Sequence, residues 1–449
     1  MICKLFNCKS SGHGRFISNR VVRLVLALCL GMTVYTLVIG TFKFTTIQTI
    51  RERIPFLANK AFTIRPLTSG RNDTLHSTAP QMKEESGNLP NIDTLIQGIA
   101  FNQTYKDALA ADIERREAQR PSNWRLSDAQ YTSDTQFVNY MNCATSVRKK
   151  LLLESFFTKK YLPEVPILIW NKHYSQEEYE RLAQFRSIFG WKVASASVIS
   201  SALSLLNTTS NTYMFDHDRS PGQDGCTSCA VIGNGGILNG SKMGKEIDSH
   251  DYVFRVNVAL TKGHEEDVGT KTSFYCAAFR SLSNSVMSGA RYGFHAPPYQ
   301  KGIRYVFFPK TDWAYMFLSA VFSDKPAPRN PADGRSPPKF QTKLTANDVK
   351  LVHPDFERYI RDRWVNSTRR KNVEFYRPST GAIMLILALH TCDKVDVYGF
   401  AGSFTKYSEY YYDTAFRKHV SYLNHDSDIE KELWIQLHQL GIINLYTRE

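Results

Sequence analysis

The stretch of sequence that decides the fold is Cys229-Ala-Val-Ile-Gly-Asn-Gly-Gly-Ile-Leu-Asn-Gly240. An apolar run leads directly into a glycine-rich turn, which is typical of a buried strand followed by a helix in an α/β fold. Glycines at such a turn let backbone N–H groups approach an anionic or nucleotide ligand, although a plain structural turn uses them equally. The dinucleotide-binding pattern G-x-G-x-x-G is not met, because Leu238 occupies the third position after Gly233 and Gly235.

On both sides of this turn, short apolar runs alternate with helical patterns. Such alternation predicts an α/β fold with a mostly parallel sheet and helices on both faces. The pattern begins near residue 136, so we predict one large domain over 136–449. The predicted strands are 165–170, 230–232, 251–255, 304–308, 395–398 and 443–446, and the predicted helices are 176–189, 381–390 and 428–440.

The N-terminal segment combines basic charge with one long apolar run. No Asp or Glu precedes Glu52, whereas residues 1–51 carry seven of the basic groups behind the net charge of +14. Residues 24–42 are uncharged, and a helix of this length spans about 28 Å, close to the hydrocarbon core of a bilayer. We predict a cytoplasmic tail over 1–23 and a transmembrane signal-anchor over 24–42, since a cleaved signal peptide has a shorter apolar core. The short span favours a Golgi or endoplasmic reticulum membrane.

Residues 43–135 have the composition of a lumenal stem. They are polar and show no hydrophobic period, so they cannot bury enough apolar area to offset the entropy of ordering. We find no basic helix with interleaved aromatic residues, so the charge does not indicate a nucleic-acid partner. N-x-S/T sequons beyond the anchor make Asn72, Asn102, Asn207 and Asn366 candidates for glycosylation, whereas Asn239 is expected to be too enclosed.

Five cysteines follow the anchor: Cys143, Cys226, Cys229, Cys276 and Cys392. The C-x-x-C pair has neither the second pair nor the nearby histidines of a zinc site, and it lacks the context of a redox motif. In an oxidising lumen we expect two structural disulfides and one free thiol. The spacing alone leaves the pairing open.

A second segment suited to chemistry is 376–390, in which Pro378 and Ser379 open an apolar helix. The free N–H groups and the positive dipole end of such a helix would face a ligand. The alternative is an ordinary capped core helix.

A third segment centres on His425, just before the last predicted helix. Histidine is the side chain best suited to act as a general base near neutral pH. The alternative is a surface histidine beside an N-cap formed by Asp426 or Asp428. Two Asp-x-Asp pairs, Asp426 with Asp428 and Asp216 with Asp218, look like the metal sites of sugar-nucleotide transferases, but such pairs are also common by chance.

Together, these three segments resemble the animal sialyltransferases in order and spacing. The glycine-rich turn with 250–257 and 267–275 is similar to the family's large motif, and 376–398 is similar to its small motif. Residues 409–413 occupy the third motif, and His425 and Glu430 match the very small motif. Within the family, 237–241, 351–356 and 390–392 look most like the GalNAc α-2,6-sialyltransferases of types one and two.

The resemblance implies a single Rossmann-like, GT-A-like domain that transfers sialic acid from CMP-sialic acid, with inversion and without a metal or cofactor. The implied acceptor is GalNAc of mucin-type O-glycans on glycoproteins, and the implied location is the Golgi membrane, with a lumenal catalytic domain behind one type II anchor. It also implies the disulfides Cys143–Cys226 and Cys229–Cys392, with Cys276 left free.

The family's site residues transfer by position onto this sequence. Asn234 and Asn257 would contact CMP; Ser379, Thr380 and Gly381 would hold the donor's phosphate or carboxylate; and His425 would take the proton from the acceptor O6. The third motif often begins with His where this chain has Tyr410. We assign Tyr410 or Tyr411 to donate a hydrogen bond to the leaving phosphate, although a phenol carries no positive charge.

Three other functions stay open from the sequence. These are a sialyltransferase with a different acceptor, a nicotinamide-dependent oxidoreductase built on the glycine turn, and an anchored glycan-binding protein without activity. The missing third glycine disfavours the oxidoreductase, and the histidine and both asparagines disfavour a loss of activity. Acceptor choice is expected to depend on loops over 280–300 and 323–345, where the sequence has no readable code.

Overall fold

The computed structural model describes residues 131–132, 134 and 143–448, other than 158, 187, 217–224, 324, 331–333, 335, 372–375 and 404. The predicted tail, anchor and most of the stem, with Asn72 and Asn102, lie outside these residues. Within the described residues, no helix combines the length and the apolar character needed to cross a membrane.

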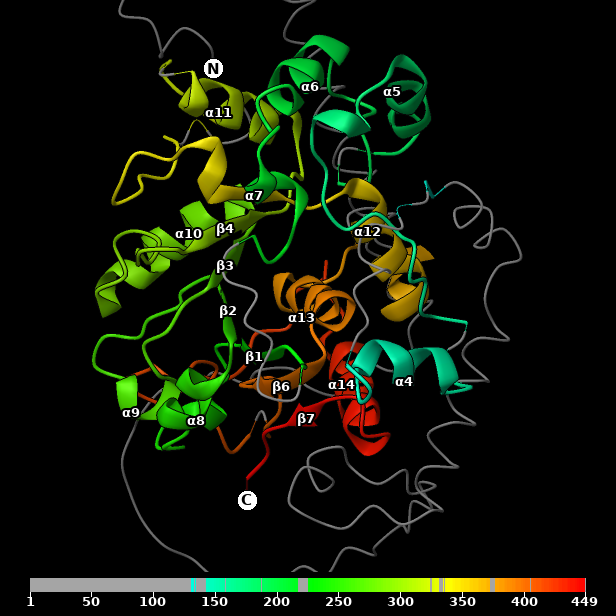
Figure 1. Cartoon of the computed structure of the whole chain (residues 1–449). Coiled ribbons are helices and arrows are strands. Elements are labelled where there is room, and N and C mark those ends of the chain that lie inside the picture. The colour runs from blue at the N-terminus through cyan, green and yellow to red at the C-terminus, as the bar shows by residue number, and fades with distance from the viewer. Residues whose placement is uncertain are drawn as a thin grey trace, which may run out of the picture. The chain divides into compact units, whose positions relative to one another are not determined.

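Seven strands in this described part form one sheet, in the order β5-β4-β3-β2-β1-β6-β7, and each neighbouring pair is parallel (Figure 1). The sheet confirms the predicted α/β class, and five of the predicted strands match β1, β2, β4, β6 and β7 to within a few residues. The strands are β1 (Ser228–Ile232), β2 (Tyr252–Val256), β3 (Phe274–Ala277), β4 (Arg304–Phe307), β5 (Val349–Leu351), β6 (Lys394–Tyr398) and β7 (Asn444–Leu445).

Alternate residues of each strand enter two apolar cores, one on each face of the sheet. Cys229 and Val231 of β1 lie in a core with α4, α12, α13 and α14, whereas Ala230 and Ile232 lie in a core with α5, α6, α8, α10 and α11. The helices are α4 (Val147–Leu153), α5 (Gln176–Ala183), α6 (Ala196–Leu203), α7 (Thr209–Thr212), α8 (Gly244–Ser249), α9 (Glu265–Val268), α10 (Phe279–Gly289), α11 (Asp312–Phe322), α12 (Pro354–Tyr359), α13 (Thr380–Thr391) and α14 (Ser427–Gln439).

The prediction of a strand over 165–170 is wrong. The segment is extended, but it pairs only through one antiparallel bridge, between Leu168 and Val352. Pro166 has no N–H to donate to a ladder. Ile167 and Ile169 are buried in the two different cores, so the apolar run reflects burial on two sides and not membership of the sheet.

The helix predicted over 176–189 ends early, at Ala183. The N–H of Trp191 donates to the Leu182 carbonyl at 2.8 Å, which turns the chain back against the end of the helix. Gly190 permits this turn, because a Cβ there would lie 2.3 Å from the same carbonyl oxygen. The tight return buries Trp191 completely.

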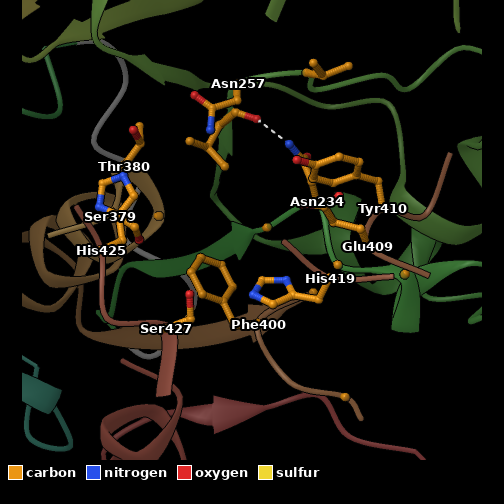
Figure 2. A pocket seen from close by; sticks show the side chains of 18 of the residues that line it. Asn234, Asn257, Ser379, Thr380, Phe400, Glu409, Tyr410, His419, His425 and Ser427 are labelled. Atoms are coloured by element: carbon orange, nitrogen blue, oxygen red, sulfur yellow. Dashed lines mark hydrogen bonds between the residues drawn. The ribbon is translucent and has the colours of Figure 1, made fainter. Parts of the chain in front are cut away.

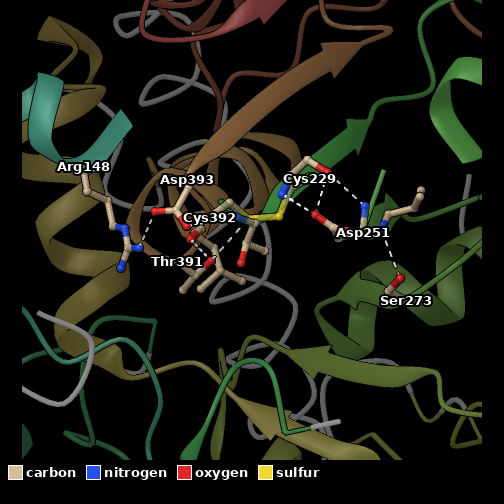
Figure 3. Close-up of a disulfide and its surroundings, with 11 residues drawn as sticks. Arg148, Cys229, Asp251, Ser273, Thr391, Cys392 and Asp393 are labelled. Carbon is tan, nitrogen blue, oxygen red and sulfur yellow. Dashed lines mark hydrogen bonds and ion pairs between the residues drawn. A yellow bond between two sulfur atoms is a disulfide. The ribbon is translucent and has the colours of Figure 1, made fainter. Parts of the chain in front are cut away.

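Two disulfides, Cys143–Cys226 and Cys229–Cys392, confirm the pairing that the resemblance implied, and Cys276 is a free, buried thiol. Figure 3 shows the Cys229–Cys392 bond. Cys229 lies near the start of β1 and Cys392 caps the end of α13. The Cys229–Cys392 bond joins two residues that are 163 positions apart in sequence. For a loop of this length, chain-entropy arguments give about 5 kcal/mol of stabilisation. It therefore anchors the end of α13 that lies away from the glycine-rich turn.

A second cross-link between elements involves His250, just after α8. Its Nδ1 lies 3.0 Å from the Glu246 carbonyl, and its Nε2 lies 2.7 Å from the Asp396 carboxylate of β6. Burial opposes protonation of this ring, but the hydrogen bond and charge of Asp396 outweigh it and raise the pKa of His250. The imidazolium donates from both nitrogens and ties α8 to β6.

His250→Gln is expected to cost about 1 kcal/mol more stability at about pH 5.5 than at about pH 8.5. Because the pKa is raised in the folded state, the stabilisation is complete below the unfolded value of about 6.5 and is lost as pH rises through the folded value. Urea unfolding at the two pH values measures the difference, with the exposed His295→Gln as the matched control. An equal loss at both pH values would contradict a charged His250.

Candidate active site

A cavity of about 600 Å³ opens at the carboxyl ends of β1, β2 and β6 (Figure 2). The strand order reverses at β1, because β2 pairs on one side and β6 on the other, and open α/β sheets bind ligands at such a switch point. The start of α13, one face of α10 and parts of 407–427 complete the lining. The predicted site residues that line this cavity are Asn234, Asn257, Ser379, Thr380, Gly381, Tyr410 and His425.

The glycines of the turn after β1 allow close packing of the backbone. The N–H of Gly235 donates to the Gly399 carbonyl at 3.1 Å, and a Cβ on Gly235 would lie 2.5 Å from that oxygen. A Cβ on Gly236 would lie 2.1 Å from the Ser408 carbonyl oxygen. These glycines are needed for close packing, and Gly233, Gly235 and Gly236 also line the cavity beside Asn234.

Two asparagines stand on the cavity wall at the ends of neighbouring strands (Figure 2). The side-chain amide of Asn234 donates to the Val256 carbonyl at 3.1 Å, which orients it across β1 and β2. Asn257 has a left-handed φ of 53°, which asparagine tolerates better than most residues. Its Oδ1 is buried and has no hydrogen-bond partner among the described residues, so a ligand N–H or O–H would satisfy it.

Helix α13 presents its N-terminus to the cavity. Ser379 is the N-cap, and its Oγ accepts from the Ala382 N–H at 3.0 Å. Glu430 of α14 holds this cap from behind, because its carboxyl oxygens accept from the Ser379 N–H at 2.7 Å and the Ser379 hydroxyl at 2.5 Å. The amides of Thr380 and Gly381 stay available for an anion at the positive end of the dipole.

His425 is held in the tautomer of a general base. Its Nδ1 lies 2.9 Å from the Arg377 carbonyl, which only accepts, so Nδ1 carries the proton. Its Nε2 lies 3.0 Å from the Asn424 amide nitrogen, which donates, so Nε2 offers its lone pair. Burial, together with the charges of Lys310 and Arg377, lowers the pKa of His425 to about 4, although the hydrogen bond to the Arg377 carbonyl opposes the shift. The ring is therefore neutral near pH 7 and can accept a proton.

Tyr410 and Tyr411 lie in different surroundings. Tyr410 lines the cavity, and burial raises the pKa of its phenol, which stays protonated and able to donate. Tyr411 is 1% exposed, and its hydroxyl donates to the Leu260 carbonyl at 2.6 Å. Tyr411 does not line the cavity, so its assignment to the leaving phosphate is corrected to a packing role.

A family model for glycosyltransferase family 29 (sialyltransferase) matches residues 168–442. The chain belongs to this family. It is 40% identical over 311 residues to alpha-N-acetylgalactosaminide alpha-2,6-sialyltransferase 2 of mouse, covering 68% of this chain and 83% of the relative. The human protein of the same name is 41% identical over 289 residues, covering 63% of this chain and 77% of the relative. The type 1 enzyme of chicken is 36% identical over 378 residues, covering 82% and 65%.

A solved structure described as a mammalian sialyltransferase has the same fold. It superposes with a TM-score of 0.52 at 22% identity, covering 69% of this chain and 99% of that chain. Membership of the family makes this protein a sialyltransferase and removes the oxidoreductase hypothesis, which the internally bonded glycine turn also disfavours.

One face of α10 lines the sialyltransferase cavity, where the sequence was expected to form a loop. Ser281, Asn284, Ser285 and Ser288 follow one another at helical spacing and all face the cavity. The loop expected over 280–300 is therefore wrong for its first half, because α10 extends to Gly289. The polar residues at i, i+3, i+4 and i+7 were the available signal.

Two further cavity residues, Arg377 and His419, carried no sequence signal of their own. Arg377 stands inside the small motif, where the Ser379 cap drew attention away from it. His419 lies outside every motif, and Figure 2 shows its ring at the cavity. The chain turns back before it, since the N–H of Glu409 donates to the Arg417 carbonyl at 2.8 Å.

The Asp-x-Asp pairs have structural roles in the described residues. Asp426 caps α14 and accepts from Ser367 at 2.5 Å, and Asp216 is bonded to Lys350 at 2.8 Å and to Arg304 at 3.0 Å; Asp218 lies outside the described residues. One described cluster has the geometry for a metal, formed by Glu178, His353 and Asp355. Arginine side chains already occupy its carboxylates, since Arg181 bonds to Glu178 and Asp355, and Arg358 bonds to Asp355.

The sequons in the described region differ in access. Asn207 is exposed. Asn239 is exposed too, so the expectation that it is too enclosed is wrong. The Nδ2 of Asn366, the atom that would carry the glycan, is buried, and Ser367 is 2% exposed. A glycan on Asn366 does not fit this conformation.

Proposed function

We propose that this sialyltransferase transfers sialic acid from CMP-sialic acid in α-2,6 linkage to GalNAc of mucin-type O-glycans. The observation that carries the proposal is one cavity that joins a neutral, oriented His425 to the capped start of α13 and to two asparagines. The names of the mouse, human and chicken relatives support the linkage and the acceptor.

The proposed mechanism is a single inverting displacement. The acceptor O6 attacks the anomeric carbon of sialic acid as Nε2 of His425 takes the hydroxyl proton, so the Asn424 amide must release that nitrogen. The bond from the anomeric carbon to the phosphate oxygen breaks, and CMP leaves with the electron pair. The start of α13 binds one donor anion, and Tyr410 donates to the phosphate as its charge grows.

The acceptor assignment is tested by offering CMP-sialic acid with GalNAc–peptide, Galβ1,3GalNAc–peptide and lactosamine. Products are expected on one or both GalNAc acceptors, with the new linkage at O6 of GalNAc. Products only on lactosamine would refute the assignment. No product on any acceptor, together with intact CMP binding, would favour the anchored glycan-binding alternative.

The chemistry is proposed to need no metal, because the groups assigned to the phosphate are N–H and O–H donors and both Asp-x-Asp pairs have structural partners at Asp426 and Asp216. The same assay in excess EDTA should give undiminished rates. A clear loss that added Mn²⁺ or Mg²⁺ restores would contradict metal independence.

We further propose a single-pass type II topology in the Golgi membrane. The predicted anchor over 24–42 supports it, as do two disulfides, which persist in an oxidising compartment. Protease added to intact Golgi vesicles should remove only the short tail and spare the disulfide-linked domain. Digestion of the domain without detergent would contradict this orientation.

A further inference from the structure

Arg377 is fixed against the segment that carries the proposed base. Its N–H donates to the Asn424 carbonyl at 3.0 Å, and its carbonyl accepts from Nδ1 of His425 at 2.9 Å. Its side chain lines the cavity. Hydrogen bonds at both its N–H and its carbonyl therefore fix the backbone of Arg377, which carries the guanidinium at the cavity.

The guanidinium of Arg377 makes no hydrogen bond or ion pair with the described residues, and its Nε is buried without an acceptor. Other buried arginines of the domain are paired: Arg148 with Asp393 at 2.7 Å, Arg304 with Asp216 at 3.0 Å. A permanent charge with five N–H donors, partly withdrawn from water, needs an acceptor that the protein does not supply.

The charges around Arg377 also leave this end of the cavity positive. Glu357 attracts Arg377 electrostatically, but this fully buried carboxyl group also faces Lys310 at 3.8 Å and is shared between the two cations. Arg280 adds a further positive charge close by, which together with burial lowers the pKa of Arg377. Glu430 is already bonded to the N-cap of α13. An anionic ligand group would balance the excess.

We propose that Arg377 binds the carboxylate of a sialic acid in the transfer complex. This inference rests on the proposed function. A carboxylate accepts two parallel hydrogen bonds from a guanidinium, a geometry that a lysine does not match. The donor carries two anionic groups, a phosphate and a carboxylate, and the amides of Thr380 and Gly381 provide a place for one of them. Arg377, three residues before Thr380, provides a place for the other.

A sialic acid already attached to the acceptor presents the same carboxylate as the donor. If Arg377 binds the donor's carboxylate, the KM for CMP-sialic acid depends on it; if it binds the acceptor's carboxylate, the KM for the sialylated acceptor does. We compare the wild type with Arg377→Gln and Arg377→Lys, and use Arg291→Gln as a matched loss of charge at an exposed position outside the cavity lining. KM is measured for CMP-sialic acid and for GalNAc–peptide, Galβ1,3GalNAc–peptide and its α-2,3-sialylated form. The Kd of CMP, which has no carboxylate, is measured by calorimetry.

Arg377→Gln is expected to raise the KM of the substrate whose carboxylate it binds by about ten- to a hundredfold. The KM of Arg377→Lys should lie between those of the wild type and Arg377→Gln, and the Kd of CMP should be unchanged in both variants. A higher KM for CMP-sialic acid with every acceptor identifies the donor's carboxylate. A higher KM confined to the sialylated acceptor identifies the acceptor's carboxylate.

Two results overturn the proposal: unchanged KM values for all substrates, or a loss of CMP affinity as large as the rise in KM, which would place Arg377 on the phosphate. Absence of transfer by the wild type to all three acceptors would instead refute the proposed function. Unchanged CMP binding in Arg377→Gln shows that the site remains folded.

Discussion

His425→Ala is expected to lower kcat for sialyl transfer by about 10²–10⁴-fold while the Kd of CMP stays within about twofold of the wild type. The acceptor hydroxyl is a weak nucleophile whose proton must leave during attack, and Nε2 of His425 is the oriented, neutral acceptor for it. The α13 amides and both asparagines are untouched by the change, so nucleotide binding survives. Single-turnover transfer and CMP calorimetry measure the two quantities separately.

The pH profile gives the same prediction a second readout. Burial, with the charges of Lys310 and Arg377, holds the pKa of His425 at about 4 in the free enzyme. The acid limb of kcat/KM should therefore lie near pH 4, well below the usual value of about 6.5 for histidine. The donor's negative charges raise the pKa of His425 when bound, so the acid limb of kcat should lie at higher pH.

The exposed His295→Ala is the matched control and should retain wild-type rates. Full activity of His425→Ala would remove it from the mechanism. A residual rate that still shows the same acid limb would assign that limb to another group.

Tyr410→Phe is expected to lower kcat by about 10²–10³-fold with little change in acceptor KM, because a donor to the leaving phosphate matters most as its charge develops. The phenol lines the cavity, and the hydrogen bond from the Tyr410 N–H to the Asp413 carboxylate at 2.9 Å fixes its backbone. Burial raises the pKa of the phenol and keeps it protonated, so its donation is independent of pH near neutrality. The exposed Tyr299→Phe serves as the control for loss of a hydroxyl.

His419→Asn, measured in the same experiment, tests whether His419 and not Tyr410 donates to the leaving phosphate. His419 lines the same cavity, and burial lowers its pKa, but an imidazole that is protonated beside a bound phosphate can supply a positive charge that Tyr410 cannot. If His419→Asn carries the larger loss in kcat and Tyr410→Phe is near wild type, the histidine replaces the tyrosine as the group on the leaving phosphate. Near wild-type rates in both variants would leave the α13 amides and Asn234 as the donors.

The fold was predictable from sequence wherever an apolar run has the length of a buried strand and ends at a turn residue. The runs at β1, β2, β4 and β6 satisfy this condition, because parallel strands covered on both faces are apolar throughout. The segment 165–170 satisfies it too and is not a strand. A segment buried between two cores has the same apolar run as a strand of the sheet. The two differ only in that 165–170 has a single bridge where a strand has a ladder of hydrogen bonds.

The candidate site was predictable to the extent that each functional side chain follows a strand or opens a helix. Asn234 and Asn257 follow β1 and β2, and Ser379 caps α13; the resemblance singled out these residues, and the parallel sheet brings all three to one edge. The resemblance added the role of His425. Tyr410 and Tyr411 could not be separated, because neighbours in a loop have no period that tells which side chain faces the ligand.

The sequence by itself determined the α/β class and, through the resemblance to the sialyltransferases, seven of the residues that line the cavity. Tertiary structure alone decided that the cavity lies at the switch point of the sheet, which tyrosine faces it, that His419 and one face of α10 also line it, and that Arg377 makes no hydrogen bond or ion pair with the described residues. The physical reason is the distance along the sequence between the residues that interact. Periodicity and capping depend on residues a few positions apart, whereas the charge balance at Arg377 depends on Glu357, Lys310 and Arg280, which meet only when α10, α12 and α13 pack around the sheet.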